Sequence, residues 1–261
     1  MRFILIHPIP AFNDNYIWIL TDKDSSHAWV VDPGDAKPVM QYLEAHALNL
    51  AGILITHHHS DHTGGVAKLK KHYGCHVAGP AQLVKLIDQS LVDGDTIDIF
   101  GTAFQVIATP GHTLDHLCYF ANDINDSPIL FSGDTLFRGG CGRLFEGSPQ
   151  QMHESLQKLS KLPKETLVYC THEYTLANYS FALSLEENNK NLQKYNQECR
   201  DLRAQNLPTI PTKISIEQEV NPFLRSHIEQ VSISAAKQLD QEVASSIEDK
   251  FAQIRRAKDS F

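Results

Sequence analysis

Short apolar stretches separated by turn-forming residues dominate the first two thirds of the chain. Stretches that are rich in β-branched or aromatic residues and bounded by Gly, Pro, Asn or Asp are typical of strands. They occupy residues 3–6, 16–20, 28–31, 51–55, 77–78, 96–100, 104–108, 117–120, 128–132 and 166–170. We expect the Pro-Ile-Pro sequence at residues 8–10 to end the first strand.

Helical patterns lie between these strands. Apolar spacing predicts helices over residues 37–47 and 149–159, and a further helix is expected over residues 63–72. The chain therefore opens with antiparallel β structure and continues with alternating strands and helices. No Gly-x-Gly-x-x-Gly follows the first strand, which argues against a dinucleotide-binding fold.

The composition changes beyond residue 175. Residues 176–205 and 228–257 have helical spacing, and a proline-containing break at 207–211 separates them. We therefore predict two domains, an α/β domain over residues 1–175 and an α-helical domain over residues 176–261. The second contains the basic cluster Arg255, Arg256 and Lys258. Stabilisation of a helix dipole and a role in binding remain alternatives for this cluster.

Charge and cysteine content limit the function classes. The net charge of −8 argues against a broad nucleic-acid or anionic-membrane surface, because such partners need positive potential. No apolar run approaches the length of a membrane span, and the first one is too short for a secretory signal. The five cysteines follow no CxxC pattern, which favours a reducing compartment. We expect a monomeric cytoplasmic protein.

Metal-ligand side chains are concentrated directly after the apolar run at 51–55. They are His57, His58, His59, Asp61 and His62. Because alternate side chains of an extended segment share a face, His57 and His59 can hold one ion while His58 points away. Asp61 and His62 follow a turn and suit a second ion. The spacing predicts a metal site, and a histidine run without function is the alternative.

Three later strands deliver ligand-type side chains where they end. His112 follows the strand at 104–108, Asp134 follows 128–132, and His172 follows 166–170. Loops converge at strand ends while the sheet stays rigid, so sites form there. We expect these three residues to join the first cluster.

The order His57-x-His59-x-Asp61-His62, then His112, Asp134 and His172, resembles the metallo-β-lactamase superfamily. Asp32-Pro33-Gly34 resembles its early strand-end turn. Within the superfamily, the chain is similar to the glyoxalase II family, the hydroxyacylglutathione hydrolases. The similar segments are residues 9–16, 140–143, 146–147, 172–175, 221–225 and 255–259.

The resemblance implies an αβ/βα sandwich of two mixed β-sheets flanked by helices, with a helical C-terminal domain that contributes to a glutathione pocket. It also implies two divalent metal ions per chain. By position, His57, His59 and His112 would bind the first ion, Asp61, His62 and His172 the second, and Asp134 would bridge them. An imidazole and carboxylate set without thiolate suits zinc, and also iron or manganese.

The resemblance also implies a substrate pocket that includes Arg143, Phe145, Tyr174, Arg255 and Lys258. Many relatives, notably animal ones, have Lys and Tyr where this chain has Arg143 and Phe145. Arg keeps the charge and donates in a fork to a carboxylate, whereas Phe lacks the Tyr hydroxyl. Contacts to the substrate at Phe145 therefore differ from those of such relatives.

The implied activity is hydrolysis of a glutathione thioester, S-D-lactoylglutathione, to glutathione and D-lactate, the second step of methylglyoxal detoxification. A metal-bridging hydroxide would attack the thioester, with Asp61 and Asp134 as the catalytic carboxylates. Cys141 and Cys170 are expected to be packing or lining residues, not nucleophiles. We expect Asp32 to orient a ligand histidine, and the remaining histidines, including His58, His72, His76 and His116, to lie at the surface.

Several alternatives remain. Within the superfamily they are a lactonase or β-lactamase, an RNA phosphodiesterase, which the acidic chain disfavours, and a persulfide dioxygenase, which the helical tail disfavours. A different class is a non-catalytic metal-binding module. Structural zinc sites are typically closed by four ligands, whereas seven candidates that share one carboxylate leave positions for water.

Overall fold

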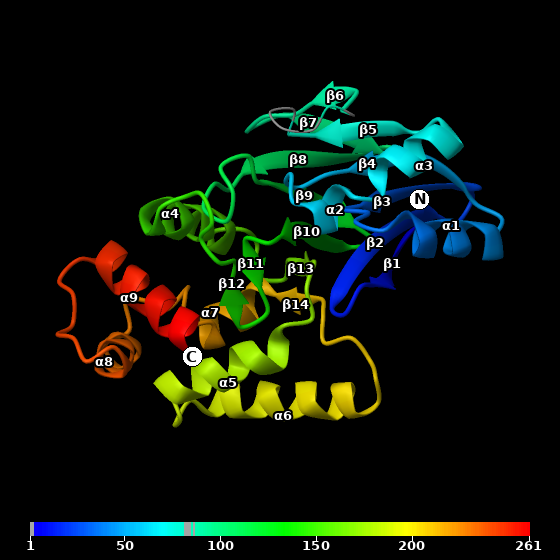
Figure 1. Cartoon of the computed structure of the whole chain (residues 1–261). Helices are drawn as coiled ribbons and strands as arrows, with labels where there is room; N and C mark the ends of the chain where they lie inside the picture. Colours follow the sequence, from blue (N-terminus) through cyan, green and yellow to red (C-terminus); the bar gives the residue numbers. More distant parts are fainter. Residues whose placement is uncertain (1–2, 81–84, 86) are drawn as a thin grey trace. The chain divides into compact units, whose positions relative to one another are not determined.

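The computed structural model describes residues 3–80, 85 and 87–261. Its helices and strands are labelled in Figure 1. The chain divides into two compact units. Unit 1 comprises Met1–Ala108 and Asp115–Gly133, and unit 2 comprises Thr109–Leu114 and Asp134–Phe261. Unit 2 thus includes residues on both sides of position 175, and the domain boundary at that position stays a prediction.

The first sheet of unit 1 has the strand order β1-β2-β3-β4-β5-β6. Its strands are β1 Ile4–Ala11, β2 Asn15–Asp22, β3 His27–Val31, β4 Asn49–Leu54, β5 His76–Gly79 and β6 Gln89–Ser90. The first three strands pair antiparallel, and the pairs from β3 to β6 are parallel. The sheet is therefore mixed, as expected.

Strand β1 continues through Pro8 and Pro10, so the expectation that these prolines end it is wrong. β1 is the edge strand, and the two prolines pair with Trp18 and Tyr16 of β2. Residues two apart direct their backbone N–H groups to the same side of a strand. The missing N–H groups fall on the free edge, where no ladder bond is lost.

Two helices cover one face of this sheet. They are α1 Ala36–Ala45 and α3 Val66–Tyr73. Val39 and Leu43 of α1, and Val66 and Leu69 of α3, are fully buried in one core with strand residues such as Ile53. The side chain of Asp35 begins α1 by accepting a hydrogen bond from the backbone N–H of Lys37.

A second set of strands in unit 1 is hydrogen-bonded to the segment that leaves β4. It contains β7 Thr96–Ile99, β8 Thr102–Ala108, β9 Leu117–Ile124 and β10 Ser127–Gly133, antiparallel in the order β10-β9-β8-β7. The Tyr119 hydroxyl donates to the carbonyl of Ile55, and the Leu117 N–H donates to the carbonyl of Thr56 over 2.8 Å. These bonds fix the segment that leaves β4, which is the segment that carries the histidine run.

Unit 2 contains short strand pairs and six helices among the described residues. The pairs are β11 Leu136–Phe137 with β12 Gly140–Cys141, and β13 Leu167–Cys170 with β14 Thr212–Lys213. The helices are α4 Pro149–Ser160, α5 Thr175–Leu185, α6 Lys190–Ala204, α7 Ile214–Val220, α8 Glu229–Gln238 and α9 Ile247–Ser260. Neither α7 nor the short β11–β12 hairpin was expected from the sequence.

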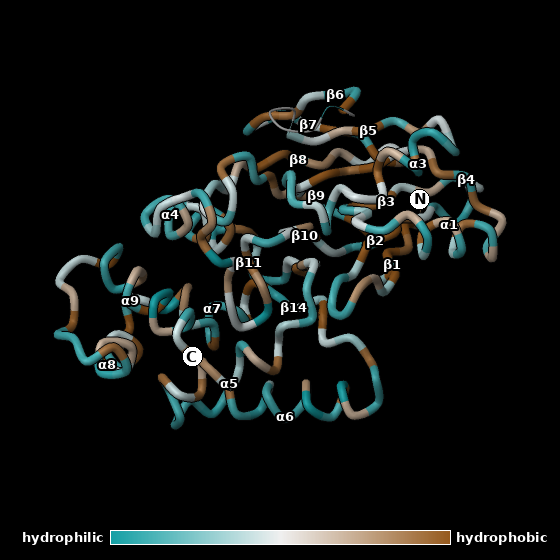
Figure 2. Tube along the Cα trace, in the orientation of Figure 1, coloured by the Kyte–Doolittle hydropathy of each residue, from teal (hydrophilic) through white to brown (hydrophobic). Residues whose placement is uncertain are grey.

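Both long helices predicted beyond residue 175 are interrupted. The first becomes α5 and α6, because the Asn189 side chain accepts from the Leu192 N–H and begins a new helix. The second becomes α8 and α9, and Ser246 begins α9 in the same way through Asp249. α6 is largely hydrophilic, whereas β8 of unit 1 is largely hydrophobic (Figure 2). The few apolar residues of α6, such as Leu192, pack in a core with Tyr179 and Val220.

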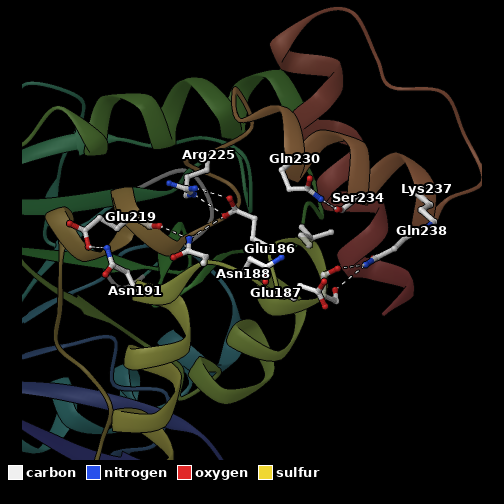
Figure 3. A pocket seen from close by; sticks show the side chains of 13 residues that line it. Glu186, Glu187, Asn188, Asn191, Glu219, Arg225, Gln230, Ser234, Lys237 and Gln238 are labelled. Atoms are coloured by element: carbon white, nitrogen blue, oxygen red, sulfur yellow. Dashed lines mark hydrogen bonds and ion pairs between the residues drawn. The ribbon is translucent and has the colours of Figure 1, made fainter.

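A polar groove of about 1070 Å³ lies among the helices of unit 2 (Figure 3). Arg225, which belongs to the family-like segment 221–225, donates from Nε and Nη2 to the two carboxylate oxygens of Glu186 at its wall. Lys237 also lines the groove and is exposed. Arg225 therefore stabilises the wall of this groove through its ion pair with Glu186.

The mixed α/β fold class predicted from the sequence is confirmed, including the helical C-terminal region. In the part of the chain that the structure describes, every helix is too short or too polar to cross a bilayer.

Candidate metal centre

Unit 1 gathers four of the predicted ligands where β4 ends. Residues 57–59 leave the strand, and Asp61 and His62 lie on the short helix α2 Ser60–Thr63. The helix predicted over 63–72 is α3, which begins slightly later, at Val66, and ends at Tyr73; Gly64 and Gly65 separate it from α2, which was not predicted. The ring of His57 lies 4.7 Å from that of His59 and 4.1 Å from that of His62, measured between centroids.

Asp32 orients two of these histidines. Its buried carboxylate accepts from the backbone N–H and the hydroxyl of Thr56, each over 2.7 Å, and from Nδ1 of His62 over 2.9 Å. Because the Thr56 hydroxyl gives its proton to Asp32, its oxygen accepts from Nδ1 of His57, 3.0 Å away. This network assigns the lone pair of both rings to Nε2. Asp32 therefore orients His62, as expected, and the role of His62 as a metal ligand stays a prediction.

Asp61 also has an orienting partner within unit 1. The side-chain amide of Asn15 donates to its Oδ2 over 3.1 Å, and the same oxygen lies 3.5 Å from Nε2 of His62. The carboxylate and the imidazole therefore present their ligand atoms side by side.

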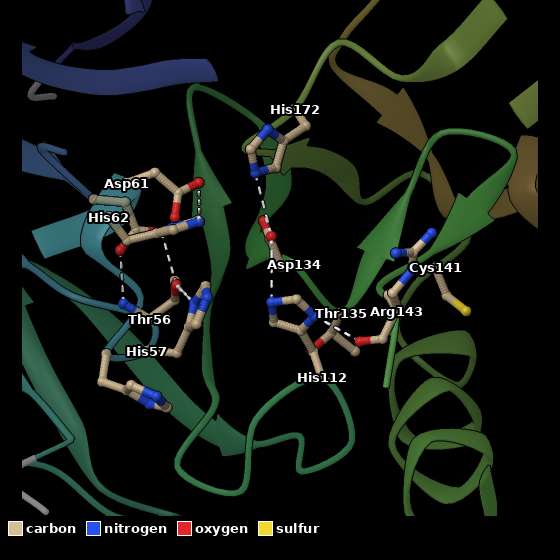
Figure 4. A network of polar contacts seen from close by, with 12 residues as sticks. Thr56, His57, Asp61, His62, His112, Asp134, Thr135, Cys141, Arg143 and His172 are labelled. Carbon is tan, nitrogen blue, oxygen red and sulfur yellow. Dashed lines mark hydrogen bonds and ion pairs between the residues drawn. The ribbon is translucent and has the colours of Figure 1, made fainter. Parts of the chain in front are cut away.

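Unit 2 gathers the other three predicted ligands around Asp134. Its Oδ2 lies 3.5 Å from Nε2 of His112 and 3.2 Å from Nε2 of His172 (Figure 4). Nδ1 of His112 donates to the carbonyl of Arg143 over 2.7 Å, which again assigns the lone pair to Nε2. The ring of His172 stacks on Tyr174 with an interplanar angle of 1°.

The chemistry of both ligand sets fits divalent metal ions. Each set combines imidazole Nε2 atoms with carboxylate oxygens, which are the ligand types of zinc, iron and manganese sites. A carboxylate oxygen and two imidazole lone pairs at the distances found around Asp134 repel one another unless a cation or a proton lies between them. The orienting bonds to Asp32 and to the Arg143 carbonyl are the kind that accompany metal-binding histidines.

The remaining histidines divide into two groups. His72 and His76 are exposed, as expected. His153 and His116 are buried, so the predicted surface position of both is wrong. His116 is fully buried. It lies directly before β9, whose backbone is tied to Thr56, and its ring therefore stacks on that of His57 with centroids 4.9 Å apart. His58 is half-buried, with Nδ1 3.0 Å from Asp115.

The cysteines are all buried and unbonded to one another. Burial raises the pKa of Cys141 to about 11 and that of Cys170 to about 12, against the partial opposing effect of Arg255 on Cys141. At neutral pH both are thiols, which are poor nucleophiles. Their expected packing role is confirmed.

The residues predicted for the substrate pocket have different environments within unit 2. Arg143 and Phe145 are exposed, with 62% of each side chain accessible, and Tyr174 is partly exposed at 39%. Lys258 is half-buried; its Nζ donates to the Ala177 carbonyl over 3.3 Å and lies over the rings of two phenylalanines. These four residues have surface available for a ligand.

Arg255 is different because its guanidinium is buried. Nη1 donates to the carbonyl of Cys141 over 3.0 Å, and Nη2 donates to Asp259 over 2.9 Å. Its charge also lies over the ring of Phe223, 4.9 Å from the centroid. The side chain therefore supports the segment around Cys141.

Comparison with known proteins places these features in a family. Residues 12–172 match the model of the metallo-beta-lactamase superfamily, and residues 173–261 match that of the hydroxyacylglutathione hydrolase C-terminus. The hydroxyacylglutathione hydrolase of Marinomonas sp. (strain MWYL1) is 59% identical over 98% of this chain and 99% of the relative. The chain belongs to the hydroxyacylglutathione hydrolase family. The member of this family from Pseudoalteromonas translucida (strain TAC 125) is 48% identical over 99% of this chain and all of the relative.

Solved structures confirm the superfamily fold of this hydroxyacylglutathione hydrolase family member. ETHE1 from Myxococcus xanthus superposes with a TM-score of 0.66 at 24% identity, over 97% of this chain and 99% of that protein. TTHA1623 in a di-iron-bound form superposes with a TM-score of 0.52 at 25% identity, over 64% of this chain and 91% of that one. The predicted metallo-β-lactamase fold of two mixed sheets flanked by helices is confirmed.

Sequence reasoning missed three groups that orient ligands. Asn15 lies within a segment that resembles the family, and Thr56 directly precedes the histidine run. Their place in the sequence could therefore have suggested a role near the ligands. The Arg143 carbonyl had no such signal, because every residue type carries a carbonyl and only the fold brings this one to His112.

Proposed function

We propose that this chain hydrolyses S-(2-hydroxyacyl)glutathione, with S-D-lactoylglutathione as the representative substrate. Water supplies the new carboxyl oxygen, the carbon–sulfur bond breaks, the glutathione sulfur takes one proton of the water, and the other is released. The observation that carries the proposal is the 59% identity to a hydroxyacylglutathione hydrolase over nearly the full length of both chains. It covers the part with the candidate ligands and also the C-terminal helices.

We infer that two divalent ions are held by the seven predicted residues. His57, His59 and His112 would hold one ion, Asp61, His62 and His172 the other, and Asp134 would contact both. When bound, such ions act as Lewis acids and lower the pKa of water towards 7. We propose zinc as the metal. Iron is the alternative with support from a relative, the di-iron-bound TTHA1623.

The residues around these ligands prepare the site in advance. Asp32 and the Arg143 carbonyl fix the rings of His62 and His112, so little reorganisation is needed when an ion binds. We propose Asp61 and Asp134 as the catalytic carboxylates, which accept hydrogen bonds from the attacking water and orient it. Asn15 keeps the Asp61 carboxylate in place.

Glutathione is an anion, and an overall charge of −8 repels it unless cations are gathered at the pocket. We propose that Arg143 and Lys258 bind its carboxylates, that Tyr174 and Phe145 line the pocket, and that Arg255 supports it from beneath. The proposal includes the predicted domains 1–175 and 176–261, a monomer, and a cytoplasmic location, where glutathione is abundant and thiols stay reduced.

Replacing Lys258 by Ala is expected to raise KM for S-D-lactoylglutathione by at least about tenfold and to change kcat by less than about threefold. A charged hydrogen bond contributes roughly 1.5–3 kcal/mol, which corresponds to about 10- to 150-fold in binding. The contact lies away from the reacting carbonyl, so its loss affects the ground and transition states equally. Steady-state kinetics at two salt concentrations measure KM. Salt screens the attraction between Lys258 and the substrate, so high salt should raise the KM of the wild-type protein and reduce its difference from that of the variant.

The matched control is Lys237→Ala, which removes an exposed lysine of the groove in the same unit. It should leave KM unchanged. Equal KM values for both variants and the wild type would limit Lys258 to packing on Phe181 and Phe261.

Replacing Cys141 or Cys170 by Ala is expected to leave kcat within about threefold of wild type, because water and not a thiol attacks. The substitutions leave small cavities, so a lower melting temperature is expected. Mass spectrometry of the enzyme during turnover provides the second measurement. A covalent acyl-enzyme would contradict the proposed attack by water.

The proposed function is tested by an assay of the metal-loaded protein on S-D-lactoylglutathione, a β-lactam and a phosphodiester. We expect rapid hydrolysis of the thioester alone. Hydrolysis of either other substrate without thioesterase activity would replace the proposal with one of the superfamily's other reactions.

A further inference from the structure

The β11–β12 hairpin connects two parts of the metal-ligand set of unit 2. Asp134 lies two residues before β11, and Arg143, whose carbonyl accepts from Nδ1 of His112, lies two residues after β12. The two ends are packed together: a Cβ atom at Gly142 would lie 2.0 Å from the Asp134 carbonyl oxygen. A shift of the hairpin therefore moves the Asp134 carboxylate and the support of His112 together.

Side chains from the C-terminal helices hold the turn of this hairpin. The amide of Asn221 donates to the carbonyls of Phe137 and Gly140 over 3.2 and 2.9 Å. The amide of Asn178 donates to the carbonyl of Arg138 over 3.1 Å. At Gly139, φ is +70° and a Cβ atom would lie 2.6 Å from the ring of Tyr179, so only glycine fits.

Glu217 is the centre of this arrangement. It lies on α7 and is fully buried. Its carboxylate accepts from the Gly139 N–H over 2.7 Å, from the Asn221 amide over 2.9 Å and from the Thr212 hydroxyl over 2.7 Å. It therefore holds the hairpin directly through Gly139 and indirectly by orienting Asn221.

The burial of this carboxylate is unfavourable by itself. Desolvation raises the pKa of Glu217, and its three hydrogen bonds act against that rise. A well-packed apolar side chain would often stabilise the unit as well or better. A buried, fully hydrogen-bonded acid at this position is therefore better explained by a requirement for exact geometry in the hairpin than by stability.

We propose that Glu217 is a positioning residue for the metal site. It fixes the β11–β12 hairpin, and the hairpin sets both the Asp134 carboxylate and the carbonyl that orients His112. The inference rests on the proposed function in one respect, namely that Asp134 and His112 are metal ligands.

The test is Glu217→Met, which keeps a side chain of similar length but removes both carboxylate oxygens that accept from Gly139, Asn221 and Thr212. Zinc affinity is measured by competition with a chelator, at a temperature where circular dichroism finds each variant folded. We expect the affinity to fall about 10- to 100-fold, as for loss of other groups that orient metal ligands. The visible spectrum of the cobalt-loaded variant is expected to change, because it reports ligand geometry.

The matched control is Ser232→Ala, which removes a different buried hydrogen bond in unit 2, from Ser232 Oγ to the Ser226 carbonyl. It should lower the melting temperature without changing zinc affinity. If Glu217→Met does not fold, Asn178→Ala removes only the hydrogen bond to the Arg138 carbonyl and is expected to lower zinc affinity about tenfold, at the lower end of the same range.

The role of Glu217 would be overturned if the folded variants bind zinc as tightly as the wild type while they are as destabilised as the control. The proposed metal site would then still stand. A wild-type protein that binds no zinc, iron or manganese would instead overturn the proposed function, and the positioning role with it. The two failures are thus distinguished in one titration series.

Discussion

Replacing Asp134 by Ala is expected to abolish the binding of two metal ions and to lower thioesterase activity by more than about a hundredfold. The carboxylate lies 3.2 and 3.5 Å from Nε2 of His172 and His112, and it is the proposed shared ligand. Loss of a group that only orients a ligand costs about 10- to 100-fold in metal affinity or activity. Loss of the ligand itself is expected to cost more.

Elemental analysis and steady-state kinetics measure this effect together. The control is Asp98→Ala. Asp98 is exposed, and its side chain accepts a hydrogen bond from the backbone N–H of Gly101 in a turn. It should bind two ions and retain activity. A wild-type protein that is fully active with a single ion per chain would contradict the shared role of Asp134.

Replacing Asp32 by Asn is expected to lower zinc affinity about 10- to 100-fold. The Asp32 carboxylate accepts from three donors, which are the Thr56 N–H, the Thr56 hydroxyl and Nδ1 of His62. After the substitution, the amide nitrogen of Asn would face a donor. Asp32 has φ +52°, and Asn tolerates this left-handed conformation as well as Asp does. The substitution therefore changes the hydrogen bonding without straining the backbone.

A pair of Thr56 variants provides the control for Asp32. Thr56→Ser keeps the hydroxyl between Asp32 and His57 and should bind zinc like the wild type. Thr56→Val removes the hydroxyl and should weaken binding in the same direction as Asp32→Asn. Isothermal titration with zinc distinguishes these cases, and equal affinity in Asp32→Asn and the wild type would restrict Asp32 to a folding role.

The strands and the ligand types could be predicted because both are local properties of the sequence. A short apolar run predicts a buried strand, and each of His112, Asp134 and His172 follows such a run closely. That Asp32 orients a histidine was also expected, but which histidine it contacts could not be predicted. Local spacing separated His57 and His59 from Asp61 and His62. How His112, Asp134 and His172 divide between the two ions was implied only by the resemblance to the family, since spacing along the chain does not give distances across a fold.

The errors arose where contacts between distant residues decide the structure. Pro8 and Pro10 are tolerated because β1 is an edge strand, a property of the sheet and not of the segment. His116 is buried because β9 brings its ring against that of His57, which is distant in sequence. The breaks at Asn189 and Ser246 had a local signal, because both are common residues at helix starts, but long apolar periodicity concealed it.

The hydrogen bonds that hold the β11–β12 hairpin have a consequence for biosynthesis. Asp134, Arg143 and the hairpin between them leave the ribosome before Asn178, Glu217, Asn221 and Arg255, the side chains that hold the hairpin. At a translation rate of about 5–20 residues per second, Arg255 is synthesised on the order of ten seconds after Arg143. During this interval the nascent chain has its ligand residues but not their support, so metal loading in this half of the site is expected to follow translation of the helices.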